Sequence, residues 1–336
     1  MRMHLLRTSR AAEIVAAFLA FTVVAARADL EDTITRAFKA DPGGQLVVDL
    51  DRGSIEIKTA DASSVNVEIT RKAGGSQSKA EQTLKDHEVT ITQTGGKVEV
   101  KAEYKGEKNR SWFSRSPELQ VQCRITVPRK FDVDLKTAGG SIKVGELIGK
   151  VQAHTSGGNM AFEKIEGPVS AHTSGGSVTV ATAKGKVDVK TSGGNLSLDD
   201  IQGDVDAQTS GGSIRAEKLT GKSFVKTSGG NIEVAGIKGQ IEARTSGGSV
   251  TAKLFEQPAG DCTFNTSGGN VTVVLDAKVA VDVDARTSAG RVSTDFPVVA
   301  VIQGEQKKNE LRGKINGGGP LITAHTSGGS VHIRKK

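Results

Sequence analysis

Basic side chains recur immediately before a threonine that itself recurs along the chain. If the repeats stack, these positions form a stripe of cations, which can bind an acidic polysaccharide or another anionic surface polymer. Carboxylates such as Asp188 and Asp206 recur two residues earlier. We favour the alternative that both columns form a solvated face, in which opposite charges offset each other at little energy per pair. The candidate ligand-binding stripe consists of Lys136, His154, His172, Lys190, Lys226, Arg244, Arg286 and His325.

Metal chemistry does not fit these residues. His154 and His172 would be neighbours in the stripe, but zinc needs further ligands and Lys190 on the next rung opposes a cation. Calcium-binding β-rolls need Gly-Gly-x-Gly-x-Asp, whereas here Ser or Asn and then an apolar residue follow each glycine pair. The sequence predicts neither a metal site nor another cofactor.

Catalysis is also not expected from this pattern. Polysaccharide lyases and hydrolases built on β-helices need a cluster of carboxylates on one face, and only Asp188 and Asp206, with Lys190 nearby, approach this. The carboxylates are spread along the chain, and no Gly-x-Ser-x-Gly elbow is present. We predict a protein that is not an enzyme, with a β-helix lyase or hydrolase as an alternative.

The elements that position these residues belong to a tandem repeat. Thr-Ser-Gly-Gly begins every 18 residues from Thr155 to Thr245, with a Thr-Ala-Gly-Gly form at Thr137. The spacing stretches to 21 at Thr266 and again at Thr287. Ser and Asn alternate after the glycine pair, which superimposes a period of 36. The paired corner glycines are Gly139, Gly140, Gly157, Gly158, Gly175, Gly176, Gly193, Gly194, Gly211, Gly212, Gly229, Gly230, Gly247, Gly248, Gly268, Gly269, Gly328 and Gly329.

Within each unit the hydrophobic period is two, which predicts two short strands and two corners. We expect Gly211, Gly212 and Gly221 to supply a positive φ at the corners, and Leu219 and its equivalents to anchor the second corner. An 18-residue unit cannot bury its apolar face alone, so the units must stack. The sequence therefore predicts an all-β fold, a β-solenoid of 18-residue coils at 131–336. A meander of hairpins that turn at each glycine pair is the alternative.

Residues 29–130 are less regular, and we predict a β-rich N-terminal cap region. Six segments alternate and are typical of strands, and Ser78–His87 is a candidate short helix. Lys105–Pro117, with Trp112 and Phe113, is expected to be an exposed loop. At the other end, Arg334-Lys335-Lys336 is expected to place charge on a final edge strand and so protect it from further pairing. The six strand segments are 46–50, 54–58, 65–69, 89–92, 98–101 and 121–127.

Residues 1–28 have the pattern of a signal peptide. A basic start precedes an apolar run from Ile14 to Val24, and Ala26-Arg27-Ala28 has the form of a cleavage site. Removal of this segment leaves 308 residues (336 − 28), with no transmembrane segment expected in the mature chain. The mature charge is only +4, from 41 basic and 37 acidic residues, so no nucleic-acid partner is expected. We predict export to the periplasm, the cell surface or the exterior.

The composition fits such a protein. Hydrophobic residues make up 36% of the chain, which is enough for a folded core, and 41 glycines indicate many backbone corners. The two cysteines, Cys123 and Cys262, are too few for a disulfide scaffold. One bridge or two buried free thiols both fit the sequence.

The order of these features resembles the putative-adhesin domain of unknown function found in bacterial exported proteins, which is similar to the head domain of predicted autotransporter adhesins. The matching segments are Gly53-Ser-Ile-Glu-Ile57, Ile125-Thr-Val-Pro128, Val133-Asp-Leu-Lys-Thr137, the tandem Thr-Ser-Gly-Gly units, Leu311-Arg-Gly-Lys-Ile-Asn-Gly-Gly-Gly319 and Thr326-Ser-Gly-Gly-Ser-Val-His-Ile333. The resemblance covers nearly all of the mature chain and implies a solenoid-like fold and a role at the cell surface or in the envelope. It implies no catalytic residues.

Together these features predict an exported adhesin or envelope-associated binding protein. It would present an extended solenoid face to a cell-surface or envelope polysaccharide, another polymer or a protein. The alternative is a structural scaffold within the periplasm.

Overall fold

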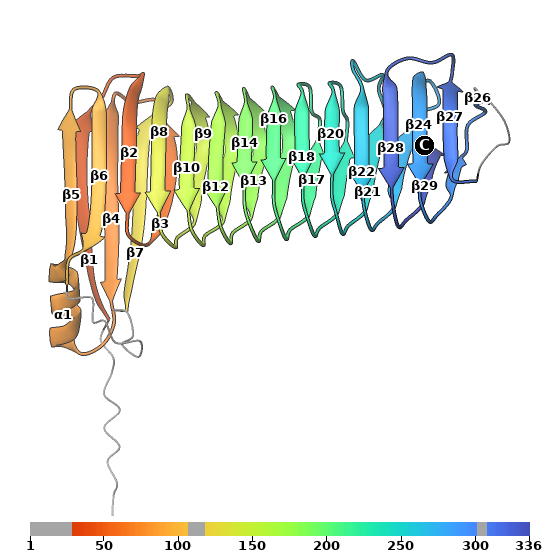
Figure 1. The fold of residues 1–336 in the computed structure, drawn as a ribbon. Helices are drawn as coiled ribbons and strands as arrows, with labels where there is room; N and C mark the ends of the chain where they lie inside the picture. The colour runs from red at the N-terminus through yellow and green to blue at the C-terminus, as the bar shows by residue number, and fades with distance from the viewer. Residues whose placement is uncertain (1–28, 107–117, 301–307) are drawn as a thin grey trace, which may run out of the picture.

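The computed structural model describes residues 29–106, 118–300 and 308–336. In these residues two long β-sheets lie face to face, with a short helix at the N-terminal end (Figure 1). One sheet, sheet A, has 14 strands and the other, sheet B, has 15. The predicted signal peptide (1–28) and most of the predicted loop, including Trp112 and Phe113, lie outside the described residues.

Each repeat forms one coil of a β-solenoid. Val151 pairs with Val169 and Val169 with Val187, always in parallel. A meander of hairpins would pair strands antiparallel, so this register confirms the predicted solenoid and excludes the meander. The sheet B strands of the coils are β8 (Phe131–Thr137), β10 (Val151–Thr155), β12 (Val169–Thr173), β14 (Val187–Lys190), β16 (Val205–Gln208), β18 (Ser223–Lys226), β20 (Ile241–Arg244) and β22 (Cys262–Thr266). The sheet A strands are β9 (Ile142–Ile148), β11 (Met160–Glu166), β13 (Val178–Lys184), β15 (Leu196–Gln202), β17 (Ile214–Glu217), β19 (Ile232–Ala235), β21 (Val250–Leu254) and β23 (Val271–Leu275).

The core lies between the sheets and is filled by alternate residues of each strand. In β16, Val205 and Ala207 are buried, whereas Asp206 and Gln208 are partly exposed. Burial of such small β-branched and aliphatic side chains in every coil supplies the main stabilising term. The predicted corner anchors are confirmed, since the following residues are at most 1% exposed: Leu147, Ile165, Ala183, Ile201, Leu219 and Ile237.

The repeated threonine joins each coil to the coil before it. The Thr191 hydroxyl donates a hydrogen bond to the carbonyl oxygen of Gly176 at 2.9 Å and accepts one from the amide of Gly194 at 3.3 Å. The same pair of bonds recurs at Thr209, where the carbonyl belongs to Gly194. Because Thr191 is 7% exposed, both bonds form away from water. In these coils a buried hydroxyl is thus satisfied once as donor and once as acceptor.

The alternation of Asn and Ser has a structural reason. The side-chain oxygen of Asn195 accepts a hydrogen bond from the amide of Ser213 at 2.8 Å, and the hydroxyl oxygen of Ser213 accepts one from the amide of Asn231 at 3.1 Å. The long and short side chains therefore take turns along the corner. This relay explains the 36-residue period that is superimposed on the 18-residue coil.

The expected positive φ at the first corner is wrong. Gly211 and Gly212 lie outside the left-handed region, and so does Gly221. Glycine is required at Gly212 because a Cβ atom there would lie 1.9 Å from the carbonyl oxygen of Gly194 in the preceding coil. Positive φ angles occur at other second corners, such as that of Gly185, where φ is 147°.

The N-terminal region extends both sheets beyond the coils. β2 (Gly44–Leu50) and β3 (Ser54–Ala60) pair in parallel with β8 and β9. The core is therefore continuous across residue 130. The domain boundary predicted at that residue stays a prediction. β6 (Lys97–Tyr104) and β5 (His87–Thr94) continue sheet B. β7 (Leu119–Pro128), β4 (Ser64–Ala73) and β1 (Leu30–Lys39) continue sheet A. The predicted helix is confirmed as α1 (Gln77–Asp86), whereas β1 was not predicted.

The last coils are not stacked in chain order. β28 (Leu321–Thr326) lies between β22 and β24 (Val281–Thr287), and β29 (Val331–Lys335) lies between β23 and β25 (Val292–Thr294). The expectation that Arg334-Lys335-Lys336 lies on an edge strand is therefore wrong. The C-terminal edges are β25 in sheet A and β26 (Val299–Ala300) in sheet B, next to β27 (Glu310–Ile315).

This inversion depends on two connections. Residues 276–280 connect β23 to β24 and skip the coil position next to β22. Residues 316–320 connect β27 to β28, cross the start of β24 and bring the chain back to the skipped position. The side-chain amide of Asn316 donates to the carbonyl oxygens of Ala277 at 2.9 Å and Val279 at 2.8 Å, which ties the two connections together.

The two glycines of one corner offer a matched test of the stacking. Gly194→Ala places a Cβ atom 2.0 Å from the carbonyl oxygen of Gly176, whereas the nearest atom to a Cβ at Gly193 is 3.7 Å away. We expect Gly194→Ala to lower the free energy of unfolding by about 1–3 kcal/mol, because the coils must move apart. Gly193→Ala is the control and should have little effect in urea denaturation. Equal stabilities of the two variants would contradict this close approach.

Candidate functional site

The outer face of sheet B brings the predicted stripe into one row. Lys136 pairs in register with His154, His154 with His172, and His172 with Lys190. Adjacent strands of a sheet lie about 4.8 Å apart, so the row is a line of closely spaced rungs. We call it the sheet B row, and in spatial order it consists of Lys136, His154, His172, Lys190, Gln208, Lys226, Arg244, Asn265, His325 and Arg286.

The structure changes the order of the row at its C-terminal end. His325 lies beside Asn265, and Arg286 follows it, because β28 is inserted between β22 and β24. Arg286 is bound by carboxylates on both sides, with 2.8 Å from Nε to Asp284 and 3.5 Å to Glu310. The hydrogen bond that this guanidinium donates to Asp284 raises its pKa above its usual value. His325 also lies 3.5 Å from Asp284.

Most cations in the middle of the row are paired as well. The Lys190 ammonium lies 3.0 Å from Asp188, the His172 ring lies 3.4 Å from the same carboxylate, and Arg244 pairs with Glu242. Burial acts to raise the pKa of Asp188, but the hydrogen bonds from Lys190 and His172 outweigh it and hold the pKa below its usual value. Asp188 is therefore an anion that orders its neighbours.

Two cations of the row differ from the others. Among the described residues, neither His154 nor Lys226 forms an ion pair. Lys226 is exposed on β18, between the neutral Gln208 and the paired Arg244. The row thus contains two basic side chains, at His154 and Lys226, that pair with no carboxylate of the described residues.

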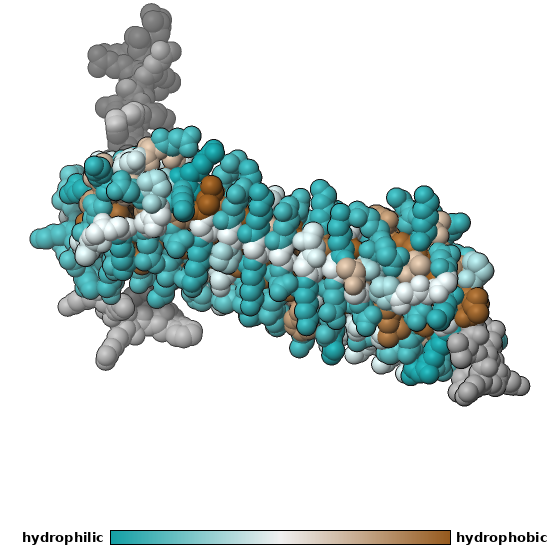
Figure 2. Space-filling view, turned by 90° about the horizontal axis from the view of Figure 1, so that it is seen from above, coloured by the Kyte–Doolittle hydropathy of each residue, from teal (hydrophilic) through white to brown (hydrophobic). Residues whose placement is uncertain are grey.

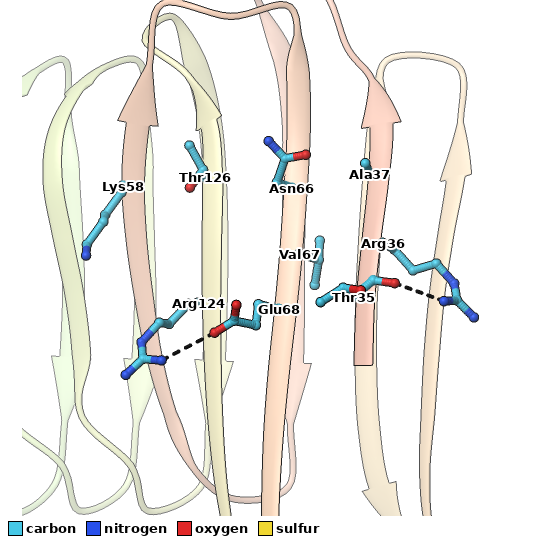
Figure 3. A pocket seen from close by; sticks show the side chains of 9 residues that line it. All are labelled: Thr35, Arg36, Ala37, Lys58, Asn66, Val67, Glu68, Arg124 and Thr126. Atoms are coloured by element: carbon cyan, nitrogen blue, oxygen red, sulfur yellow. Dashed lines mark hydrogen bonds and ion pairs between the residues drawn. The ribbon is translucent and has the colours of Figure 1, made fainter. Parts of the chain in front are cut away.

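A second concave surface lies on the outer face of sheet A, in the N-terminal region (Figure 3). It is a groove of about 390 Å³, and the guanidinium of Arg124 donates a hydrogen bond to Glu68 across its floor at 3.3 Å. β1 forms one side, so sequence analysis could not find this groove without predicting that strand. The lining residues are Thr35, Arg36, Ala37, Lys58, Asn66, Val67, Glu68, Arg124 and Thr126.

A buried polar cluster ties this region together below the groove. Arg71 binds Asp32 of β1 through Nε at 2.9 Å and donates to the carbonyl oxygens of Leu84 and His87 at the end of α1. The His87 ring is 0% exposed and lies 3.5 Å from Asp51. The cluster joins β1, β4, α1 and β5, which gives it a structural role.

The remaining reactive groups do not form a site. Within the described ranges, no three His, Cys, Asp or Glu side chains lie close enough together to hold a metal ion. Cys123 and Cys262 are both free and buried, which settles the question that the sequence left open. Burial raises the pKa of the Cys123 thiol to about 12 and that of Cys262 to about 11, so both are held as neutral thiols.

Comparison with known families identifies the fold. The family described as Toastrack DUF4097 matches residues 44–334. The chain belongs to this family. Membership confirms the resemblance to an adhesin-like domain of unknown function, and the Toastrack fold agrees with the solenoid.

Several solved structures are similar to this Toastrack chain at low identity. A putative cell adhesion protein from Clostridium sporogenes ATCC 15579 is 12% identical, with 91% of this chain and 100% of that chain covered and a TM-score of 0.21. A putative adhesin from Bacteroides fragilis NCTC 9343 is 15% identical, with 91% and 97% covered and a TM-score of 0.26. A putative lipid binding protein from Parabacteroides distasonis ATCC 8503 is 14% identical, with 91% and 97% covered and a TM-score of 0.27.

Three further findings concern curated relatives, helices and the character of the surface. No curated protein matches the Toastrack chain. Among the residues that the structure describes, no helix is long and apolar enough to cross a membrane. One long side of the Toastrack solenoid is largely hydrophilic, with small hydrophobic areas toward its C-terminal end (Figure 2).

The buried histidine predicts a dependence of stability on pH. Burial lowers the pKa of His87, and Arg71 and Arg52 act in the same direction while Asp51 opposes them. The unfolded chain therefore binds a proton near pH 6.5 that the folded chain binds only at lower pH, so stability falls as the pH drops below about 6.5. We expect His87→Gln to weaken this loss between pH 7.5 and 5.0, as measured by urea denaturation.

The partly exposed His332 provides the control. His332→Gln should leave the pH dependence of the wild type intact. If His87→Gln shows the same dependence as the wild type, His87 is not its source.

Proposed function

We propose that this chain is an exported binding protein that presents the outer face of sheet B to an acidic polysaccharide of the cell surface or envelope, without catalysis. The observation that carries the proposal is the parallel register of the sheet B row. It repeats one set of outward positions at every coil, as shown by the pairing of Lys190, Gln208 and Lys226. A linear polymer along the row meets a similar set of groups at each rung.

The ion pairs within the row are compatible with this role. Exposed pairs such as Lys190 with Asp188 contribute only about 0–1 kcal/mol each, so a ligand carboxylate can replace the protein's own at little cost. Lys226 and His154 need no such exchange. Binding of this kind weakens as salt is added, because it depends on exposed charges.

The carboxylates of the face are poorly suited to catalysis. Glycoside hydrolysis needs one carboxyl group with a raised pKa as the acid, and the pKa of Asp188 is lowered. Its neighbour in register, Asp206, accepts a hydrogen bond from the side-chain amide of Gln208 at 2.7 Å. Successive coils are joined by short corners, such as the two residues between β15 and β16, so no loop walls off a cleft there.

Export rests on the sequence of residues 1–28. A basic start, an apolar run and the Ala26-Arg27-Ala28 pattern direct a chain out of the cytoplasm. A polymer of the envelope or cell surface is therefore a ligand that the mature chain can meet.

A stiff scaffold in the envelope is the second candidate. The observation in its favour is that carboxylates of the protein already pair with Lys190, Arg244 and Arg286. A rod with a self-neutralised surface needs no ligand, so the two candidates differ in whether the face binds a polymer at all.

Charge reversal on the face separates the two candidates. We expect Lys190→Glu, Lys226→Glu and Arg244→Glu together to weaken binding of the mature chain to immobilised alginate or polygalacturonate by about tenfold or more, because three cations become anions. Biolayer interferometry at two salt concentrations measures this.

The matched control reverses three paired cations on the outer face of sheet A, namely Lys143, Arg215 and Lys253. This variant should bind like the wild type. Equal binding by both variants, or no binding by the wild type, would favour the scaffold.

A further inference from the structure

One residue departs from the pattern of the polar face. Phe224 lies at an outward position of β18, in register with Asp206 on one side and Glu242 on the other. It is partly exposed, and in the described strands of sheet B no other aromatic residue takes an outward position. Within the coils its column is otherwise polar, with Asp134, Gln152, Ser170, Asp188, Asp206, Glu242, Thr263, Thr323 and Asp284.

Packing does not account for this ring. The two cross-strand neighbours of Phe224 are carboxylates, which gain nothing from contact with an aromatic face. Val225 and Ser223, which flank it in sequence, are buried on the opposite side of the strand. Nine other coils place a polar residue here, so the fold does not need an aromatic one.

Two lysines flank the ring along the chain, Lys226 at the end of β18 and Lys222 just before its first residue. Lys222 and Lys226 are exposed, and alternation places both on the same face as Phe224. Alternate residues of a strand are about 6.6 Å apart, so both ammonium groups can reach the edge of the ring. Among the described residues, neither lysine side chain forms an ion pair.

The nearby carboxylates are already engaged. Asp206 accepts a hydrogen bond from Gln208 at 2.7 Å, and Glu242 pairs with Arg244. The carboxylate of Asp204 accepts a hydrogen bond from the backbone amide of Lys222 at 2.9 Å. The ring therefore lies between two lysines whose ammonium groups form no ion pair among the described residues.

We propose that Phe224, Lys222 and Lys226 form a subsite for one acidic sugar residue. This subsite rests on the proposed function and specifies its ligand further. The apolar face of a sugar ring stacks on Phe224, and its carboxylate pairs with Lys222 or Lys226. The hydroxyl groups of the sugar donate to the remaining oxygens of Asp206 and Glu242.

The subsite is tested with short ligands and the mature chain. Trigalacturonate and its methyl ester are titrated by isothermal calorimetry into the wild type and into Phe224→Thr. We expect the acid to bind and Phe224→Thr to bind it about tenfold more weakly, because the stacking contact is lost. Phe224→Tyr keeps an aromatic ring and should restore the affinity.

A second exposed phenylalanine provides the control. Phe255 is 38% exposed, and the ammonium of Lys336 lies 4.3 Å from the centre of its ring, but it lies outside the sheet B row. Phe255→Thr should bind trigalacturonate like the wild type. Lys222→Gln with Lys226→Gln should abolish the preference for the acid over its methyl ester.

Three results would overturn the subsite. Unchanged affinity of a folded Phe224→Thr variant, with polymer binding still lost on charge reversal, refutes the subsite and leaves the proposed function standing. No binding of trigalacturonate or of the polymers by the wild type refutes both. If a single-stranded oligonucleotide binds more tightly than trigalacturonate and this binding depends on Phe224, the ring belongs to a site for another class of ligand.

Discussion

The second glycine of each pair lies so close to the coil before it that no side chain can be added there. At Gly194 the space is closed by the carbonyl oxygen of Gly176, and that same oxygen accepts the hydrogen bond from Thr191. One atom thus sets both the distance and the register between two coils. Because the contact recurs at each corner, equivalent residues form continuous columns along both sheets. The core, the Asn and Ser relay and the sheet B row all depend on this alignment.

The alignment divides the polar groups into two sets. Those at the corner, such as Thr191 and Asn195, are used up in bonds between coils and are unavailable to a ligand. Those on the outer face of sheet B form pairs that water can reach, as with Lys190 and Asp188. A ligand can therefore bind the outer face without disturbing the contacts that hold the solenoid together. Phe224 is the position at which this face departs from its own repeat.

The sequence was sufficient for the elements that depend on local repetition. The 18-residue spacing and the hydrophobic alternation predicted the coils, the corner anchors and the outward face that carries the stripe. Three features could not be predicted because they depend on contacts between residues that are distant in sequence. β1 is an edge strand whose partner, β4, follows it after many residues. Thr266 and Thr287 have the same spacing of 21 as the preceding pair, which conceals the coil that the chain skips between them. The paired corner glycines were attributed to a need for positive φ angles. The reason for glycine is instead the neighbouring coil, which leaves no room for a side chain at the second glycine of each pair.

The central claim is that each coil adds one rung to a continuous binding face. The most direct measurement is the binding stoichiometry of trigalacturonate on a chain in which residues 191–226 are duplicated, which preserves the alternation of Asn and Ser and doubles Phe224 with its lysines. X-ray scattering of the same sample should show a rod longer by about 10 Å, the height of two rungs. The account predicts two bound ligands per chain where the wild type binds one. A folded and lengthened rod that still binds one would contradict it.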